Sequence, residues 1–169
     1  MFQEKEMEAK YKLSEGEYVR GNKLFTQLSK ASKIKYTIAV LILVAIFIFA
    51  NSPAIKGGSV FAIIGGFLGH IIQRHIYAPW ATKRQYRNYK AAQKETIISL
   101  VDEGIEFKVE NGEAILKWQD VYNWRENDEL LLVYQAPHVY HIIPKSICRQ
   151  SSVLDGLMSS LVSNVKRKT

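Results

Sequence analysis

Few residues of this 169-residue chain combine a type and a spacing that could support chemistry. His138 and His141 lie three positions apart in a predicted strand, and Cys148 follows them. Imidazole and thiolate groups are common zinc ligands. In a strand, however, residues three apart point to opposite faces, and no carboxylate or second cysteine stands at a known ligand spacing. We therefore expect no metal ion and no cofactor.

The remaining catalytic patterns are also weak. A Cys148–His141 pair could form an activated nucleophile, but a lone cysteine after a sheet is more often a small packing residue. The glycines at 65, 66 and 69 do not form a phosphate-binding loop, because they lie in an apolar run with no lysine beside them. We expect a protein that is not an enzyme.

A second group of residues has the chemistry of a contact surface. Cations and an indole in the predicted sheet could bind a protein partner or a lipid phosphate. The same cations are also typical of ordinary solvated strands, and the indole most simply belongs to the core or to a cross-strand pair. These interpretations stay open. These candidate contact residues are Lys117, Trp124, Arg125 and Lys145.

Two uncharged stretches, residues 36–55 and 57–72, are separated only by Lys56. A helix of roughly 20 apolar residues crosses the bilayer core of about 30 Å. Neither stretch has the polar face of an amphipathic soluble helix. The pattern predicts a transmembrane helical hairpin over 34–76; the alternative is a hairpin buried in a soluble core.

The net charge of +7 arises next to this hairpin. Basic residues near transmembrane ends attract anionic headgroups and stay on the cytoplasmic side. We expect both termini in the cytoplasm and a bilayer as the main partner, and no nucleic acid, because no binding motif for it is present. The predicted basic collar comprises Lys30, Lys33, Lys35, Arg74, Lys83, Arg84 and Arg87.

Small residues recur every four positions in the second apolar stretch. This spacing lets transmembrane helices approach closely. The partner of the small-residue face is either the chain's own first helix or a second copy of the chain, which would make a homo-oligomer. The residues of this face are Gly58, Ala62, Gly65, Gly66 and Gly69.

The segments that flank the hairpin predict local structure of their own. Residues 5–13 alternate as a half-buried strand does, which we expect to pair with the C-terminal domain. Ser14 and Glu17 predict a capping box at the start of a helix that runs to about residue 29. This helix lies on the inner leaflet or packs on the soluble domain. Residues 77–94 predict a basic juxtamembrane helix, kinked or restarted at Pro79.

From residue 95 the pattern changes to about six strands with tight turns, the clearest turn signal being Asn111-Gly112. A final helix follows, with an apolar stripe that includes Leu157 and Leu161. The predicted fold is α+β: a helix-capped antiparallel sheet beside the hairpin. The predicted division is 1–33 strand and amphipathic helix, 34–76 hairpin, 77–94 basic helix and 95–169 cytoplasmic domain.

Several motifs of this domain resemble one family. They are Leu100-Val-Asp-Glu-Gly-Ile105, Leu116-Lys-Trp-Gln-Asp-Val121, Leu130-Leu-Leu-Val-Tyr134 and Ile142-Ile-Pro-Lys145. Together with the hairpin they are similar to the YcxB-like bacterial membrane proteins. The resemblance implies a bacterial inner membrane, a pleckstrin-homology-like (PH-like) domain and no catalytic residues.

Two functions follow as hypotheses. The first is an inner-membrane protein that anchors a PH-like domain for binding a protein partner. The alternative is a membrane immunity or stress protein that neutralises a membrane-acting toxin through its hairpin.

Overall fold

The computed structural model describes residues 8–27, 30–110, 112–150 and 153–165. The chain forms two compact units. The first is built from the segments that end at Thr26 and begin again at Thr82, and the second is Gln27–Ala81. It is an α+β protein with antiparallel sheets, as expected.

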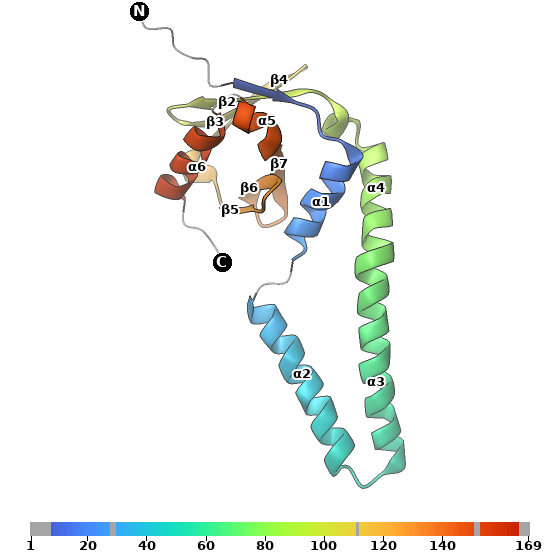
Figure 1. Ribbon diagram of the computed structural model, residues 1–169. Helices are drawn as coiled ribbons and strands as arrows, with labels where there is room; N and C mark the ends of the chain where they lie inside the picture. Colours follow the sequence, from blue (N-terminus) through green and yellow to red (C-terminus); the bar gives the residue numbers. More distant parts are fainter. Residues whose placement is uncertain (1–7, 28–29, 111, 151–152, 166–169) are drawn as a thin grey trace, which may run out of the picture. The chain divides into compact units, whose positions relative to one another are not determined.

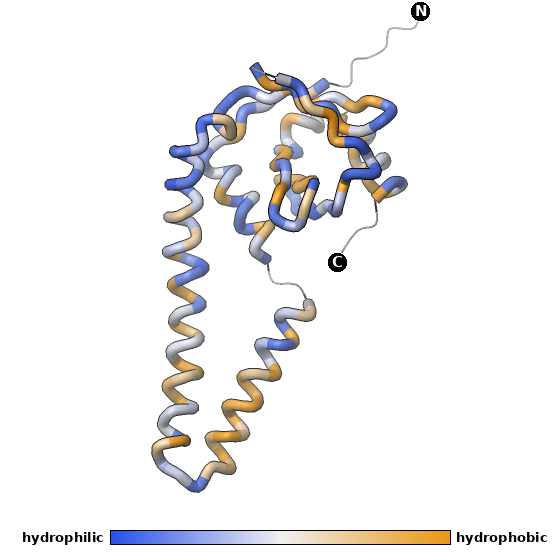
Figure 2. The backbone as a smooth tube through the Cα atoms, turned by 180° about the vertical axis from the view of Figure 1, so that it is seen from behind, coloured by the Kyte–Doolittle hydropathy of each residue, from blue (hydrophilic) through white to orange (hydrophobic). Residues whose placement is uncertain are grey.

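The second unit contains two long apolar helices, α2 (Lys30–Phe49) and α3 (Pro53–Ile72) (Figure 1). Both are long and apolar enough to cross a membrane. Their large side chains are exposed, up to 79% for Phe49 and 78% for Phe61. Figure 2 shows the apolar residues running along both helices. These helices are therefore not the buried core of a soluble fold.

A π-helical turn, η1 (Gln73–Tyr77), joins α3 to α4 (Ala78–Asn88). In this turn the Ala78 N–H donates to the Gln73 carbonyl, five residues back. Pro79 lacks an N–H and its ring crowds the preceding turn of an α-helix. The wider turn supplies the extra room. The irregularity that was expected at Pro79 is thus a π-helical turn, which ends at Tyr77, shortly before the proline.

In the first unit, sheet A comprises β1 (Glu8–Tyr11), β2 (Thr96–Val101), β3 (Gly104–Val109) and β4 (Gly112–Lys117), in that order. All pairs are antiparallel. Strand β1 pairs with β2 even though the two apolar helices separate them in the sequence. The predicted pairing of the N-terminal strand is confirmed.

Sheet B comprises β5 (Asn123–Glu126), β6 (Leu130–Ala136) and β7 (Val139–Pro144), and a 3₁₀ turn, η3 (Trp118–Asp120), links it to sheet A. The six predicted strands correspond to β2–β7. The turn between β3 and β4 differs by one residue, because Gly112 pairs with Val109 and begins β4.

The main core lies between the two sheets and two C-terminal helices, α5 (Lys145–Gln150) and α6 (Val153–Asn164). Helix α6 contributes its predicted stripe, since Leu157 and Leu161 are completely buried. The largest completely buried core side chains include Ile98, Ile105, Leu131, Val133 and Ile143.

Helix α1 (Glu15–Phe25) covers the other face of sheet B. It begins with the predicted capping box between Ser14 and Glu17. It ends four residues earlier than the predicted end near residue 29. Leu24 is buried against β6 and β7, and a Cβ on Gly21 would lie 2.6 Å from Ile142 Cδ1. The apolar face of α1 thus packs on sheet B, which is one of the two placements that the sequence left open.

Candidate functional site: an aromatic pocket beside strand β7

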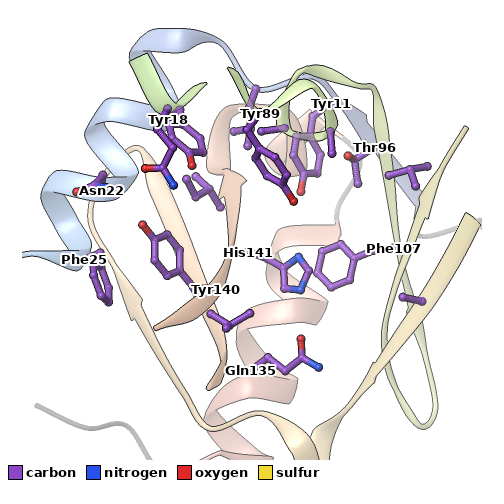
Figure 3. Close-up of a pocket in the computed structure, with 18 of the residues that line it drawn as sticks. Tyr11, Tyr18, Asn22, Phe25, Tyr89, Thr96, Phe107, Gln135, Tyr140 and His141 are labelled. Atoms are coloured by element: carbon purple, nitrogen blue, oxygen red, sulfur yellow. The ribbon is translucent and has the colours of Figure 1, made fainter. Parts of the chain in front are cut away.

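The first unit contains an open pocket of about 780 Å³. It is lined by residues of α1, β3, β4 and β7, and by the segment from the end of α4 through the 3₁₀ turn η2 (Lys90–Gln93) (Figure 3). Six aromatic side chains give it its character, so we call it the aromatic pocket. They are Tyr11, Tyr18, Phe25, Tyr89, Phe107 and Tyr140.

One wall is a cross-strand row of sheet A. The register pairs Tyr11 with Thr96, Thr96 with Val109, and Val109 with Gly112. Directly opposed residues of antiparallel strands share a face. The same face carries Ile98 and Phe107 into the core. The row therefore extends the inner face of sheet A beyond the core, which is why Val109 is 41% exposed.

The opposite wall is strand β7, which lies at the edge of sheet B. Successive side chains of a strand alternate between its faces. Tyr140 and Ile142 lie on the face that packs toward α1, whereas His141 stacks on Phe107 of sheet A. Side chains of both faces line the pocket. The pocket therefore wraps around the free edge of β7.

The lining contains few charged side chains. The His141 and Phe107 rings stack with centroids 4.1 Å apart and planes 13° apart. Burial lowers the pKa of His141, which favours the uncharged imidazole. Burial, with smaller contributions from Tyr18 and Tyr134, raises the pKa of Tyr140 to about 12. Among the described lining residues, Glu113 is the one carboxylate, and none is a lysine or arginine.

Hydrogen bonds fix the α4 side of the pocket to the β1–α1 connection. The Tyr86 hydroxyl donates to the Leu13 carbonyl at 2.6 Å, and its ring lies 5.4 Å from that of Tyr18. Gln93 Nε2 donates to the Tyr86 carbonyl at 2.7 Å. Arg87 Nε pairs with Glu15 at 3.0 Å. These contacts hold Tyr89, between Tyr86 and Gln93 in sequence, at the rim.

The two histidines of the sequence pattern are not brought together. His138 packs edge-on against Phe25 at 6.1 Å, whereas His141 stacks on Phe107. Within the described residues, no group of three His, Cys, Asp or Glu side chains could hold a metal ion. The Cys148 side chain lies outside the described part, and with it the predicted Cys148–His141 pair.

The four candidate contact residues do not form one surface. Trp124 is only 2% exposed and belongs to the core. Arg125 Nη1 donates to the carbonyls of Leu24, at 3.0 Å, and Phe25, at 3.3 Å, at the C-terminal end of α1. Lys145 pairs with Glu126 at 2.6 Å, largely buried. Lys117, which pairs with Glu103 at 3.6 Å, is half-exposed.

The predicted collar residues are separated between the units. Lys33 and Lys35 lie exposed on α2, and Arg74 lies half-buried in η1. Lys83, Arg84 and Arg87 lie on α4, where Arg87 has an ionic partner, Glu15, in the first unit. The Lys30 side chain is outside the described part.

The small-residue face of α3 does not pack against α2. A Cβ added at Gly58, Gly65, Gly66 or Gly69 would meet nothing within 4 Å. Ala62, which completes this face, is also exposed. In the described structure these glycines make no contact with α2, and the partner of this face, the first helix or a second copy of the chain, stays a prediction.

Sequence reasoning missed the aromatic pocket. Tyr86 and Tyr89 stand among basic residues next to the apolar stretch, a pattern typical of an interfacial aromatic belt and not of a pocket. The available signal was the count of nine tyrosines, several of them outside the apolar stretches. Only the pairing of β1 with β2 brings Tyr11 to this site.

Comparison with known proteins gives one match. The family model described as YcxB-like protein matches residues 102–154, which include β3 to β7 and the pocket walls that these strands contribute. This match confirms the resemblance seen in the sequence motifs. No curated protein and no solved structure matched the chain.

Proposed function

We propose, from the YcxB-like match, that this chain is a non-enzymatic protein of the bacterial inner membrane. Helices α2 and α3 anchor a cytoplasmic PH-like domain, and the aromatic pocket of that domain binds a protein partner. The carrying observation is the position of the two exposed apolar helices between β1 and β2, which are neighbours in one sheet.

The exposed apolar surface of α2 and α3 supports the anchor. Apolar patches larger than a few hundred Å² are rare on soluble monomers. Here the exposed side chains run along both helices and include Phe47, Phe61 and Phe67. Lys33, Lys35 and Arg74 near the helix ends favour cytoplasmic termini by the positive-inside rule.

The fold of the first unit supports the binding role. Its two antiparallel sheets, closed by a C-terminal helix, agree with the PH-like domain that the family resemblance implies. The pocket volume falls within the roughly 300–1,000 Å³ typical of ligand sites. Its aromatic faces and phenolic hydroxyls are suited to recognition, because such rings lose little conformational freedom on binding. The toxin-neutralising alternative gains no comparable support from the described residues.

The anchor is tested by extraction and labelling. In a Cys148→Ser background, we expect Asn51→Cys, between the two helices, to react with an impermeant thiol reagent in intact cells. Val162→Cys, on the exposed face of α6, should react only after the cells are permeabilised. Release of the chain from membranes at alkaline pH, or the reverse labelling pattern, would overturn the proposal.

The pocket is tested by photocrosslinking in native membranes. Ala114 and Ile115 are neighbours on β4, both exposed, and their side chains point to opposite faces. Only Ala114 lines the pocket. A benzophenone amino acid at 114 should give a discrete adduct that the same group at 115 does not give. Identical adducts from both positions, or none from 114, would contradict a partner at the pocket.

A further inference from the structure

We infer that the aromatic pocket takes an extended, uncharged peptide segment, which adds as a strand to the free edge of β7. This inference rests on the proposed binding function and specifies its ligand. The segment would hydrogen-bond along residues 139–142 and place apolar side chains on both sides of sheet B.

The edge of β7 supplies the main-chain contact. Sheet B has the order β5-β6-β7, so β6 pairs with one side of β7 and no described strand pairs with the other. A free strand edge presents unpaired N–H and C=O groups, which an added peptide strand can satisfy. The pocket is lined by Val139, Tyr140, His141 and Ile142, successive residues of that edge strand. At about 3.3 Å per residue, they extend over roughly 13 Å.

The surroundings of the edge define the side chains of the segment. Side chains of an added strand alternate between the two faces of the sheet. On one face they would meet Phe107, Tyr11 and the His141 ring, and on the other Tyr18, Phe25 and the Tyr140 ring. Both environments are aromatic, so the segment is apolar at successive positions, with room for hydroxyl or amide groups at the tyrosine rim.

The charge of the lining disfavours an anionic ligand. A buried carboxylate or phosphate needs a cationic or hydrogen-bonding partner that offsets its desolvation. No lysine or arginine is present among the described residues of the pocket, and Glu113 would repel an anion. A phosphorylated segment or an anionic headgroup is therefore not expected at this site.

The first test measures the charge preference. The full chain in detergent is applied to an array of octapeptides drawn from Phe, Leu, Ile, Val, Tyr, Ser and Thr. A matched array carries Asp, Glu or phosphoserine at the two central positions. We expect binders in the uncharged set and at least tenfold weaker binding in the acidic set. Equal or stronger binding of the acidic peptides would overturn the inference.

The second test identifies strand addition. In an added strand, alternate amide N–H groups point toward β7. We expect N-methylation at the amides that point toward β7, which are every second residue of the tightest-binding octapeptide, to reduce its affinity at least tenfold. N-methylation at the residues between them should reduce its affinity less than threefold. Tolerance of N-methylation at every position would show that the pocket takes a side chain without a strand and would overturn the inference.

Two matched variants locate the site. Val139 is 53% exposed at the pocket, and Val162 is 66% exposed on α6, away from it. Val139→Glu should weaken the tightest octapeptide at least tenfold, whereas Val162→Glu should leave it within twofold. Equal affinities of the two variants, both with wild-type melting temperatures, would contradict binding at β7.

The outcomes separate the inference from the proposed function. If Ala114 gives a position-specific adduct in membranes but no octapeptide binds, strand addition is wrong and partner binding stands. If octapeptides bind with the expected N-methyl pattern but the probe at position 114 gives no adduct, the inferred ligand class is correct and the proposed binding of a protein partner in membranes is wrong.

Discussion

At the scale of single residues, the two glycines of the β3–β4 strand pair differ in whether they have room for a side chain. A Cβ at Gly104 would overlap the Leu116 carbonyl oxygen and lie 2.7 Å from Lys117 Cα. A Cβ at Gly112, at the other end of the β3–β4 pair, would meet nothing within 4 Å. The obstacle at Gly104 is backbone of the paired strand, which a rotamer change cannot move.

We therefore expect Gly104→Ala to lower the free energy of unfolding by about 1–3 kcal/mol or more, the range for overpacked sites. Gly112→Ala is the matched control and should change it by less than about 0.5 kcal/mol, as at open surface sites. Denaturant unfolding followed by tryptophan fluorescence measures both. Equal effects of the two substitutions would show that the backbone of β4 can shift at Leu116 at little cost in stability.

His141 makes the stability of the first unit depend on pH. Burial holds its pKa below the ordinary value of about 6.5, so the unfolded chain binds more protons between these two pKa values. Stability is therefore lost as the pH falls through about 6.5, and the loss is complete below the folded-state pKa. Melting temperatures at pH 7.5 and 5.0 should differ less for His141→Gln than for the wild type. His138→Gln, at an exposed site, should keep the wild-type difference, and an identical profile for both variants would exclude His141 as the cause.

At the scale of elements, helix α1 is fixed at both ends. Ser14 and Glu17 cap its start, Leu24 is buried on sheet B, and Arg125 of β5 donates to its last carbonyls. This long-range contact satisfies carbonyls that the end of an α-helix leaves without intrahelical partners. Arg125 is therefore a structural residue of the domain.

Arg125→Met should destabilise the first unit by about 1–3 kcal/mol, because it leaves carbonyl groups at a half-buried helix end without a charged donor. Lys117→Met removes a cation from a half-exposed pair and should cost at most about 1 kcal/mol. Thermal melts of the two variants in the same detergent compare these costs. A larger loss of stability from Lys117→Met than from Arg125→Met would mean that the carbonyl groups at the end of α1 do not need the hydrogen bonds from Arg125.

These elements also show what the sequence could predict. Strands β2–β7 and the α6 stripe were predictable because local alternation and helical spacing specify them. The capping box was predictable for the same reason, since its two residues lie three apart. The docking of α1 was left open, because Ile142, whose side chain requires a glycine at position 21, lies far along the chain. The aromatic pocket depends on the same kind of distant pairing.

At the scale of the whole molecule, one domain is assembled from two separate segments. Ala9, Tyr11 and Leu24 are buried in cores otherwise built from residues beyond 95. Burial of a large apolar side chain such as Leu24 contributes about 1.5–3 kcal/mol to stability. The C-terminal segment 95–169 is consequently an incomplete domain.

Replacement of residues 27–81 by a flexible Gly/Ser linker of about twelve residues should give a soluble, cooperatively folding domain. The fragment 95–169 should not fold cooperatively, because it lacks β1 and α1. Near-ultraviolet circular dichroism with thermal unfolding distinguishes the two. A cooperative transition in 95–169 would show that the N-terminal segment is dispensable for the fold.

The location of the apolar helices between β1 and β2 has a consequence for biogenesis. The ribosome releases β1 long before β2, so sheet A can close only after the intervening helices have been synthesised. If α2 and α3 cross a membrane as proposed, two crossings return β2 to the compartment that holds β1, whereas a single crossing would leave the two strands on opposite sides of the bilayer. Such a chain would keep an open β2 edge, the kind of surface that proteases and aggregation act on. Under the proposed anchoring, closure of sheet A therefore requires that α2 and α3 both cross the membrane.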